Sequence, residues 1–267
     1  MGDELITSAA NPLVKRIRRL AQRRHRRAEQ ATVVFGIQPV RQAAEAGFDI
    51  DTLVVAPELL RAESAHAFVA DLAGRGVPVA QLSGELFGRL ADRDGPTGLA
   101  AVVGTRHVDL ASWTPTPAAT YLAVDRLANP GNLGTILRTA DATGTAGVIL
   151  VGATADPWDP ATIKASMGAT FGVPIATVAD QPALVRWAHD HGLPVATTAA
   201  RAPHGLWEIE FPESLVVLLG AEQTGLDDAA LAAGDLQVSI PMVGTAESLN
   251  VAQAATVLLY EIWRQHS

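Results

Sequence analysis

Short apolar segments alternate with helix-forming segments along the second half of the chain, and this alternation constrains the fold more than any other feature. The apolar segments are rich in Val, Leu, Ile and Ala. Strands that are buried on both faces of a parallel sheet have this near-continuous apolar composition. We therefore expect an α/β fold whose mostly parallel sheet carries helices on both faces. The expected strands are residues 121–124, 147–151, 175–178, 195–198, 215–219 and 237–240.

Polar residues mark the expected helix starts. Asp159 and Asp180 each stand shortly before a proline, and Ser248 precedes an amphipathic segment that runs to Trp263. Side-chain oxygens at such positions accept hydrogen bonds from the first free N–H groups of a helix, and proline is tolerated in the first turn. These three residues are therefore predicted to lie at helix N-termini, close to the carboxyl ends of strands.

A smaller α/β unit precedes this domain. Strands are expected at residues 32–35, 52–55, 77–82 and 98–103, with helices near 39–46 and 62–73. Alternating prolines at 115 and 117 then deny both helix and sheet their hydrogen bonds. We expect an N-terminal domain over residues 1–105, a linker over 106–118 and a C-terminal domain over 119–267.

A basic segment stands out against an acidic chain, whose formal net charge is −8. Eight of the 20 Lys and Arg residues lie within residues 15–27. A dense, Arg-rich block of this kind is typical of an arm that contacts nucleic-acid phosphates, and the alternative is a solvated helix face. The predicted RNA-contacting residues are Lys15, Arg16, Arg18, Arg19, Arg23, Arg24, Arg26 and Arg27.

The composition excludes several classes of protein. The absence of cysteine rules out disulfides, thiolate metal sites and cysteine nucleophiles. No apolar run reaches the length of a membrane span, and the polar first residues do not resemble a secretory signal, so we expect a soluble, cytoplasmic protein. His189 and His191 could suggest a metal, but just before Gly192 they better complement a helix dipole, and no metal is predicted.

A glycine-containing turn follows the strand expected at 121–124. It reads Asn129-Pro130-Gly131-Asn132 and leads into a helical segment that contains Arg138. Free N–H groups at such a helix start can hold a phosphate or a carboxylate. On an ideal helix, the rotation from Asn132 to Arg138 is about 120° short of two full turns, so the two side chains would not share one face. A shared site therefore requires Asn132 to act from the turn and Arg138 to reach back from the helix. The alternative is a structural turn followed by a surface arginine.

Two further segments have the same construction. The strand at 215–219 runs into Gly220-Ala221-Glu222 and then Gly225, which leaves backbone exposed where a flat ligand could lie. The strand at 237–240 ends in Ile240-Pro241-Met242, and a short loop leads to Ser248-Leu249-Asn250. In an open parallel sheet, ligands bind outside the carboxyl ends of the strands, where all three segments are expected to lie. Taken singly, each segment could also be a structural loop.

Taken in order, the three segments resemble the three motifs of the SpoU/TrmH family of RNA 2′-O-ribose methyltransferases. The resemblance covers the C-terminal domain. The N-terminal unit resembles, more loosely, the ribosomal-protein-like RNA-binding domain of many family members, at Phe35-Gly36 and at Gly95 to Gly98. Relatives often have an acidic residue where this chain has Phe35, so no site residue is assigned there.

The resemblance implies properties that the residues alone do not predict. The C-terminal sheet would be tied in a deep trefoil knot, whereas general topology rules favour an open sheet. S-adenosyl-L-methionine would lie in the loops of the second and third motifs, and the family is typically a homodimer through this domain. The implied cofactor-binding residues are Gly220, Ala221, Ile240, Met242 and Leu249.

Methyl transfer to a ribose hydroxyl requires an aligned oxygen and help in removing its proton. The resemblance assigns an essential role to Arg138. A guanidinium normally stays charged, so Arg138 acts either as a base shifted by a neighbour or as a group that holds phosphate and polarises the hydroxyl. Asn132 and Asn250 would position the ribose or Arg138, and Glu222 and Ser248 would orient that arginine or the substrate phosphate.

The expected activity is therefore S-adenosylmethionine-dependent 2′-O-methylation of RNA, with 23S ribosomal RNA preferred. Two alternatives remain at this point: a tRNA 2′-O-methyltransferase, and a catalytically inactive dimeric RNA-binding protein that would bind no cofactor. A nucleotide-dependent oxidoreductase is disfavoured, because the turn at 129–134 lacks the third glycine of the dinucleotide fingerprint.

Overall fold

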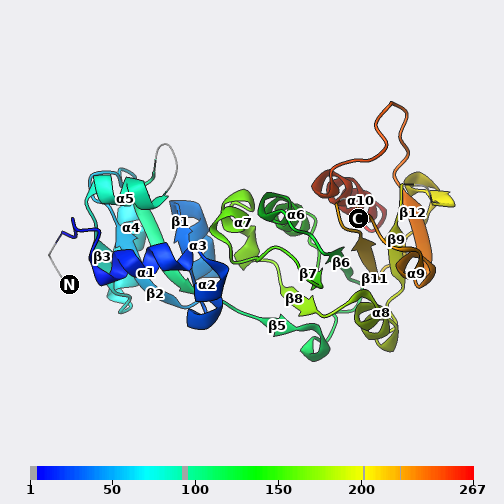
Figure 1. Cartoon of the computed structure of the whole chain (residues 1–267), viewed down its shortest axis with the longest axis horizontal. Helices are drawn as coiled ribbons and strands as arrows, with labels where there is room; N and C mark the ends of the chain where they lie inside the picture. Colours follow the sequence, from blue (N-terminus) through cyan, green and yellow to red (C-terminus); the bar gives the residue numbers. More distant parts are fainter. Residues whose placement is uncertain (1–4, 92–95, 201, 223) are drawn as a thin grey trace. The chain divides into compact units, whose positions relative to one another are not determined.

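The computed structural model describes residues 5–91, 96–200, 202–222 and 224–267. Gly95 and Gln223, which belong to segments discussed above, lie outside the described residues. The chain forms two compact units (Figure 1). Unit 1 comprises Met1–Arg106 together with Trp158–Gly172, and unit 2 comprises His107–Pro157 and Val173–Ser267. The continuous domain ranges given above remain predictions about which segments would fold independently.

Unit 1 contains a mixed sheet in the order β1-β4-β2-β3. The β4 strand pairs antiparallel with β1 and β2, and β3 is parallel to β2. The strands are β1 (Ala31–Phe35), β2 (Ile50–Val55), β3 (Val79–Gln81) and β4 (Leu99–Gly104). The helices are α1 (Pro12–Leu20), α2 (Arg23–Glu29), α3 (Ile37–Glu45), α4 (Glu63–Gly74) and α5 (Gly84–Ala91).

Residues 158–172 pack into unit 1, although they come from the second half of the chain. They form α7 (Pro160–Ala165) and a 3-10 turn η2 (Ala169–Phe171). The rings of Trp158 and Phe171 contact Phe48 at centroid distances of 5.5 and 5.0 Å, and the Thr32 hydroxyl donates to the Trp158 carbonyl at 2.7 Å. This segment is therefore part of the hydrophobic core of unit 1.

The sheet of unit 2 confirms the expected parallel arrangement. In the described residues its order is β10-β12-β9-β11-β6-β7-β8-β5, and every paired strand is parallel. The strands are β5 (Val108–Asp109), β6 (Thr120–Asp125), β7 (Gly147–Val151), β8 (Ile175–Val178), β9 (Val195–Thr198), β10 (His204–Gly205), β11 (Leu215–Leu219) and β12 (Leu236–Ser239). The remaining elements are the α-helices α6 (Pro130–Ala142), α8 (Gln181–Asp190), α9 (Asp228–Ala232) and α10 (Val251–Gln265), and the 3-10 turns η1 (Leu110–Ser112) and η3 (Leu206–Glu208).

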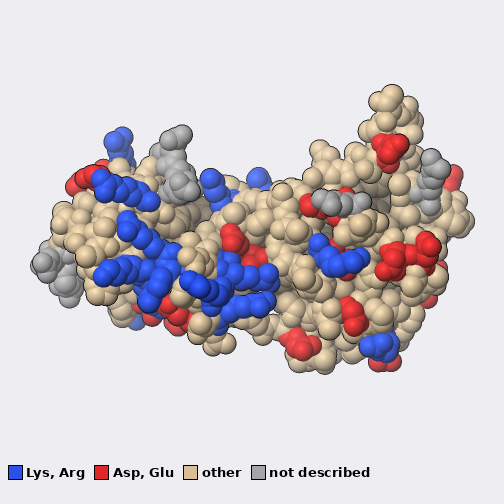
Figure 2. All heavy atoms as spheres, in the orientation of Figure 1, with Lys and Arg blue, Asp and Glu red and all other residues tan. Residues whose placement is uncertain are grey.

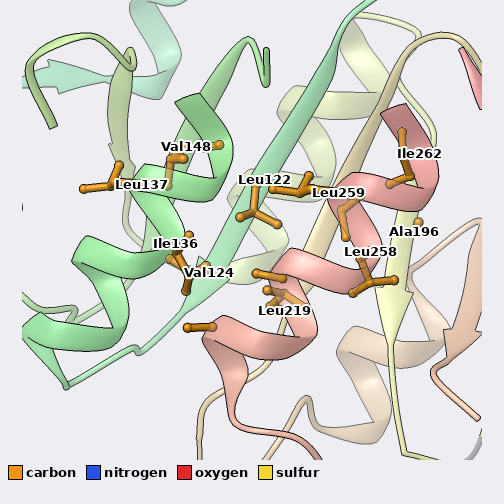
Figure 3. Close-up of a cluster of buried hydrophobic side chains, with 14 of the residues drawn as sticks. Leu122, Val124, Ile136, Leu137, Val148, Ala196, Leu219, Leu258, Leu259 and Ile262 are labelled. Atoms are coloured by element: carbon orange, nitrogen blue, oxygen red, sulfur yellow. The ribbon is translucent and has the colours of Figure 1, made fainter. Parts of the chain in front are cut away.

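Successive strand residues point to opposite sides of the sheet, so apolar strands make both faces apolar. Helices therefore cover both faces. Leu122 of β6 faces α6 and α10, where Figure 3 shows it with Ile136 and Leu258. The residue before it in the chain, Tyr121, faces the other side and packs against Trp187 of α8. Two apolar layers thus hold the strand ends in fixed positions. None of the described helices is long and apolar enough to cross a membrane.

The segment predicted as a linker is packed onto unit 2. Within it, β5 pairs with β8, Leu110 is buried, and Trp113 contacts Tyr121 and Trp187. Its prolines interrupt regular structure, as expected. Trp113, which lies between β5 and these prolines, nevertheless joins the core.

The basic segment folds as two helices, α1 and α2. The α1 helix ends at Leu20. The Arg26 guanidinium donates hydrogen bonds to the carbonyl of Leu20 at 3.0 Å and to that of Ala21 at 2.8 Å. The last carbonyls of a helix have no N–H partner within it. A side chain that donates to them takes the place of the backbone N–H groups of a further turn, so the helix can end there. The chain therefore bends at Gln22, and α2 starts anew.

Candidate active site

A cavity of about 400 Å³ lies at the carboxyl ends of β9, β11 and β12 in unit 2. This volume is within the range of small-molecule sites. Its lining comes from residues after β11, residues after β12 and the entry to α10, which include the second and third motifs. All five predicted cofactor-binding residues line it, namely Gly220, Ala221, Ile240, Met242 and Leu249.

The loop after β11 folds back tightly on itself. Ala221 and Gly225 form an isolated antiparallel bridge, in which the Gly225 N–H donates to the Ala221 carbonyl at 2.9 Å. A Cβ atom added at Gly220 would lie 2.3 Å from the carbonyl carbon of Gly225 and 2.4 Å from the Leu226 nitrogen. Since both neighbours are backbone atoms, only glycine fits at position 220 without moving the loop.

The third motif forms the opposite wall of the cavity. Ile240, Ser248 and Leu249 line it. The helix that follows is capped by Asn250, whose Oδ1 accepts from the Ala252 N–H at 2.9 Å. Asn250 rather than Ser248 is thus the helix N-cap. This corrects the sequence-based assignment, in which the spacing from the apolar stretch could not separate two polar residues so close together.

The first motif lies in the opening turn of α6. Asn129 caps this helix, since its Oδ1 accepts from the N–H groups of Gly131 and Asn132 at 2.8 and 3.2 Å, with Pro130 in the first turn. Asn132 is therefore inside the helix rather than in the turn before it. This placement replaces the geometry expected from the sequence and fixes the direction of its side chain.

Asn132 joins the three motifs. Its Nδ2 donates a hydrogen bond to Glu222 Oε1, and its Oδ1 accepts one from Asn250 Nδ2 at 3.3 Å. Glu222 also lines the cavity. Residues that are 90 and 118 positions apart in the sequence are thus brought together around one amide at the rim of the cavity.

Arg138 lies elsewhere in the same chain. It is exposed on α6 and is not among the residues lining the cavity. Within the described residues, no hydrogen bond or ion pair engages its guanidinium, so the carboxylate of Glu222 does not orient it here. Arg138 is therefore free to meet a ligand or another copy of the chain.

Thr198, the last residue of β9, and the two residues after it also line the cavity, and the sequence motifs do not include them. Their position at the carboxyl end of an apolar parallel strand was the available signal. They carry no charged side chain, and motif-based reasoning passes over such residues.

The basic side chains of α1 and α2 divide into two groups. Arg26 is only 2% exposed and donates to Asp159 Oδ2 at 2.7 Å, in addition to the two α1 carbonyls. Arg16 bonds Glu29 at 2.8 Å and Asp51 at 2.6 Å, contacts that raise its pKa further. Burial removes Arg26 from the set that can touch RNA, because its charge is committed to holding unit 1 together.

The other basic residues remain at the surface and gather over α1 and α2 (Figure 2). The Arg19 guanidinium is 3.9 Å from the Glu29 carboxylate, and so long an ion pair at an exposed side chain is weak. We call this group the basic surface. It consists of Lys15, Arg18, Arg19, Arg23, Arg24 and Arg27.

Comparison with known proteins agrees with the geometry of both units. Residues 119–260 match the SpoU rRNA Methylase family, and residues 11–101 match the MRM3-like substrate binding domain. An uncharacterized tRNA/rRNA methyltransferase of Synechocystis is 35% identical over 97% of this chain and 93% of its own length. The 23S rRNA (guanosine(2553)-2′-O)-methyltransferase of Bacillus subtilis is 31% identical over 96% of this chain and 98% of its own.

A solved structure extends the similarity to three dimensions. The AdoMet-bound rRNA methyltransferase from Sinorhizobium meliloti superimposes with a TM-score of 0.88 at 34% identity, covering 98% of each chain. A family match over more than half of the sequence, full-length relatives and a shared fold lead to one conclusion. This chain belongs to the SpoU rRNA methylase family.

Proposed function

We propose that this protein transfers the methyl group of S-adenosylmethionine to the 2′-hydroxyl of a ribose in 23S ribosomal RNA. The observation that carries the proposal is the junction at Asn132, which joins Glu222 and Asn250 at the rim of the cavity. The Bacillus subtilis relative is named for this reaction, and the Sinorhizobium meliloti relative was solved with AdoMet. The MRM3-like substrate binding domain over residues 11–101 supports RNA as the substrate.

The cavity fits S-adenosylmethionine in size and chemistry. Its walls combine apolar side chains, among them Ile240 and Leu249, with backbone exposed beside Gly220. Such walls accept a purine ring and leave peptide groups to recognise its polar edge. We propose Gly220, Ala221, Ile240, Met242 and Leu249 as the cofactor-binding residues. When bound, the cofactor supplies a methyl group activated by a positively charged sulfur.

The polar residues at the rim hold the acceptor ribose. Glu222 and Asn250 fix the amide of Asn132, so this side chain is already ordered before substrate arrives. A preorganised amide can align a hydroxyl without losing further conformational entropy when the substrate binds. Ser248, on the cavity wall, presents a further hydroxyl to the same space.

Arg138 is proposed to bind the substrate phosphate and polarise the ribose hydroxyl. A guanidinium is a cationic fork of N–H donors, which suits a phosphate-binding group better than a base. Because Arg138 does not line the cavity of its own chain, we further propose a homodimer in which this residue serves the site of the other copy. The exposed Tyr260 and Trp263 on α10, 46% and 52% accessible, support an interface on unit 2. The trefoil knot of the C-terminal domain remains a prediction from family membership.

Replacing Arg138 by Ala tests the assignment. Methyl transfer from labelled cofactor to 23S rRNA purified from cells lacking this protein should fall by about 100-fold or more, as for other transition-state contacts. The calorimetric affinity for S-adenosylmethionine should stay within about twofold, since no cavity wall changes. The matched control is Arg186→Ala, another exposed arginine on a helix of unit 2. Near-normal transfer by the Arg138 variant would contradict the proposal, and a wild-type protein that binds no cofactor would support the inactive RNA-binding alternative.

A further inference from the structure

A second cavity lies wholly within unit 1, apart from the site described above. Its volume is about 420 Å³, and α1, β1, α5 and α7 supply its walls. Three features of the lining carry the argument: the apolar residues Val33 and Phe35, the cations Arg18, Arg89 and Lys164, and the carboxylate of Asp159.

The floor of this cavity is apolar and partly aromatic. Val33 and Ile163 are buried, and Phe35 packs edge-to-face on Phe87 at a centroid distance of 6.0 Å. Phe35 is only partly covered, so it offers aromatic surface to the cavity. A flat ring could be accommodated there by stacking or apolar contact.

The rim of the cavity is cationic. Arg18 and Lys164 are exposed and have no ion-pair partner among the residues that the structure describes. Arg89 is paired with Glu85 at 2.5 Å, but both side chains are largely exposed and such pairs are weak.

Among the described residues of the lining, the one carboxylate is already engaged. Asp159 Oδ2 accepts from Arg26, and Oδ1 accepts from the Ala161 N–H at 2.9 Å. Its charge is therefore offset by the buried guanidinium, and the described lining presents net positive charge to a ligand. Arg18 also belongs to the basic surface, which makes the cavity continuous with that surface.

We propose that this cavity receives one unpaired nucleotide of the RNA substrate, with its base against Phe35 and its phosphates on Arg18 and Lys164. An anionic ligand with a flat apolar ring matches both the floor and the rim, and an RNA strand crossing the basic surface would bring such a group to the opening. The inference rests on the proposed function, because it takes RNA as the ligand. It assigns to α7 a role in choosing the substrate, through a segment encoded between β7 and β8.

Two variants of one exposed residue test the electrostatic part. Ala161 lies on the rim at the start of α7, where Glu should not harm the helix because an acidic side chain suits a helix N-terminus. Ala161→Glu should weaken binding of a fluorescein-labelled, mixed-sequence, single-stranded RNA of about 12 nucleotides by about fivefold or more at 0.1 M salt, because each lost phosphate contact counts strongly there. Ala161→Gln has the same bulk without the charge and should stay within about twofold of the wild type. Equal affinities for the two variants would overturn the proposal.

The requirement for an unpaired base is tested by Phe35→Leu. This variant keeps apolar volume and removes the ring, so single-stranded RNA should bind about fivefold to tenfold more weakly, as expected for the loss of one stacked base. The same strand annealed to its complement should bind within about twofold of its wild-type affinity, since its bases are already stacked. Equal losses for both forms would reduce the cavity to part of a phosphate-binding surface and overturn the proposal. So would micromolar binding of free uridine monophosphate, which would identify a site for free nucleotides.

These assays contain no cofactor, so they separate the two proposals. Weaker binding of single-stranded RNA by the Phe35→Leu and Ala161→Glu variants supports the nucleotide cavity even if no methyl transfer is found. Methyl transfer that depends on Arg138, together with unchanged RNA affinities in these variants, would support the proposed function and refute the cavity. Melting temperatures and circular dichroism spectra of each variant show whether a loss of binding reflects a loss of fold.

Discussion

Gly220→Ala should abolish most cofactor affinity while leaving the protein folded. The new Cβ would lie 2.3 Å from the Gly225 carbonyl carbon, 2.4 Å from the Leu226 nitrogen and 2.8 Å from the Gly225 Cα. Ordinary contacts at such a position begin near 3.4 Å, so the loop must move by about 1 Å. No flexible side chain can absorb that shift, because all three neighbours are backbone atoms.

The size of the effect follows from this displacement. Overpacking of a close-packed site costs about 1–3 kcal/mol of unfolding free energy, which lowers the melting temperature of a chain of this size by about 2–4 °C for each kcal/mol. A misplacement of about 1 Å in a binding site can cost about 100-fold. Since the moved backbone is a wall of the cavity, the dissociation constant for S-adenosylmethionine should rise by about 10-fold to 100-fold.

Isothermal titration calorimetry with S-adenosylmethionine measures this effect directly. Gly244→Ala is the matched control, because a Cβ at Gly244 meets nothing within 4 Å and its backbone is not left-handed. The control should bind the cofactor as the wild type does. If Gly220→Ala also binds within about twofold of the wild type, the cofactor does not lie against this loop, and the reasoning from its close approach fails.

Three further predictions concern the rest of the chain. Arg26→Met should lower the unfolding free energy in urea by about 3 kcal/mol, because a half-buried carboxylate partner and two helix-end carbonyls lose their buried donor; a loss below about 1 kcal/mol would refute that structural role. Reversing Arg24 and Arg27 to Glu should weaken RNA binding and flatten its dependence on salt by about one unit of slope per lost phosphate contact, whereas an unchanged slope would mean that they form only a solvated helix face. The hydrogen bond from Arg264 lowers the pKa of Glu261 to about 2 from 4.5, so the stability that this carboxylate contributes is present above pH 4.5 and is lost as the pH falls toward 2. Glu261→Gln should therefore flatten the pH dependence of the melting temperature over that range, and identical slopes for both proteins would contradict the assignment.

Local signals in the sequence predicted much of the second half of the chain. The apolar runs gave the strands β6, β7, β8, β9 and β11 within a residue or so, because residues buried on both faces leave little room for another interpretation. Asp159 and Asp180 cap α7 and α8 as expected, since a side chain that caps a helix start acts on N–H groups only two or three residues away. The prediction that the motifs converge at one edge of the sheet also depended only on strand direction.

Contacts between distant parts of the chain could not be predicted in the same way. Nothing near Trp158 in the sequence indicates that it packs against Phe48 in the core of unit 1, because an apolar segment does not reveal which core it joins. Arg26 resembles its exposed neighbours in the sequence, and only the fold brings Asp159 to it. The weak edge strands β5 and β10 have two residues each and no periodicity to detect.

The most direct test of the central claim identifies the product of the reaction. Purified protein is incubated with labelled S-adenosylmethionine and 23S rRNA from cells that lack it, and the RNA is then digested to nucleosides and analysed by mass spectrometry. The account predicts a single 2′-O-methylated nucleoside with wild-type protein and a loss of that product with the Arg138→Ala variant. A methyl group on a base, or no methyl group in RNA while the cofactor binds normally, would contradict it.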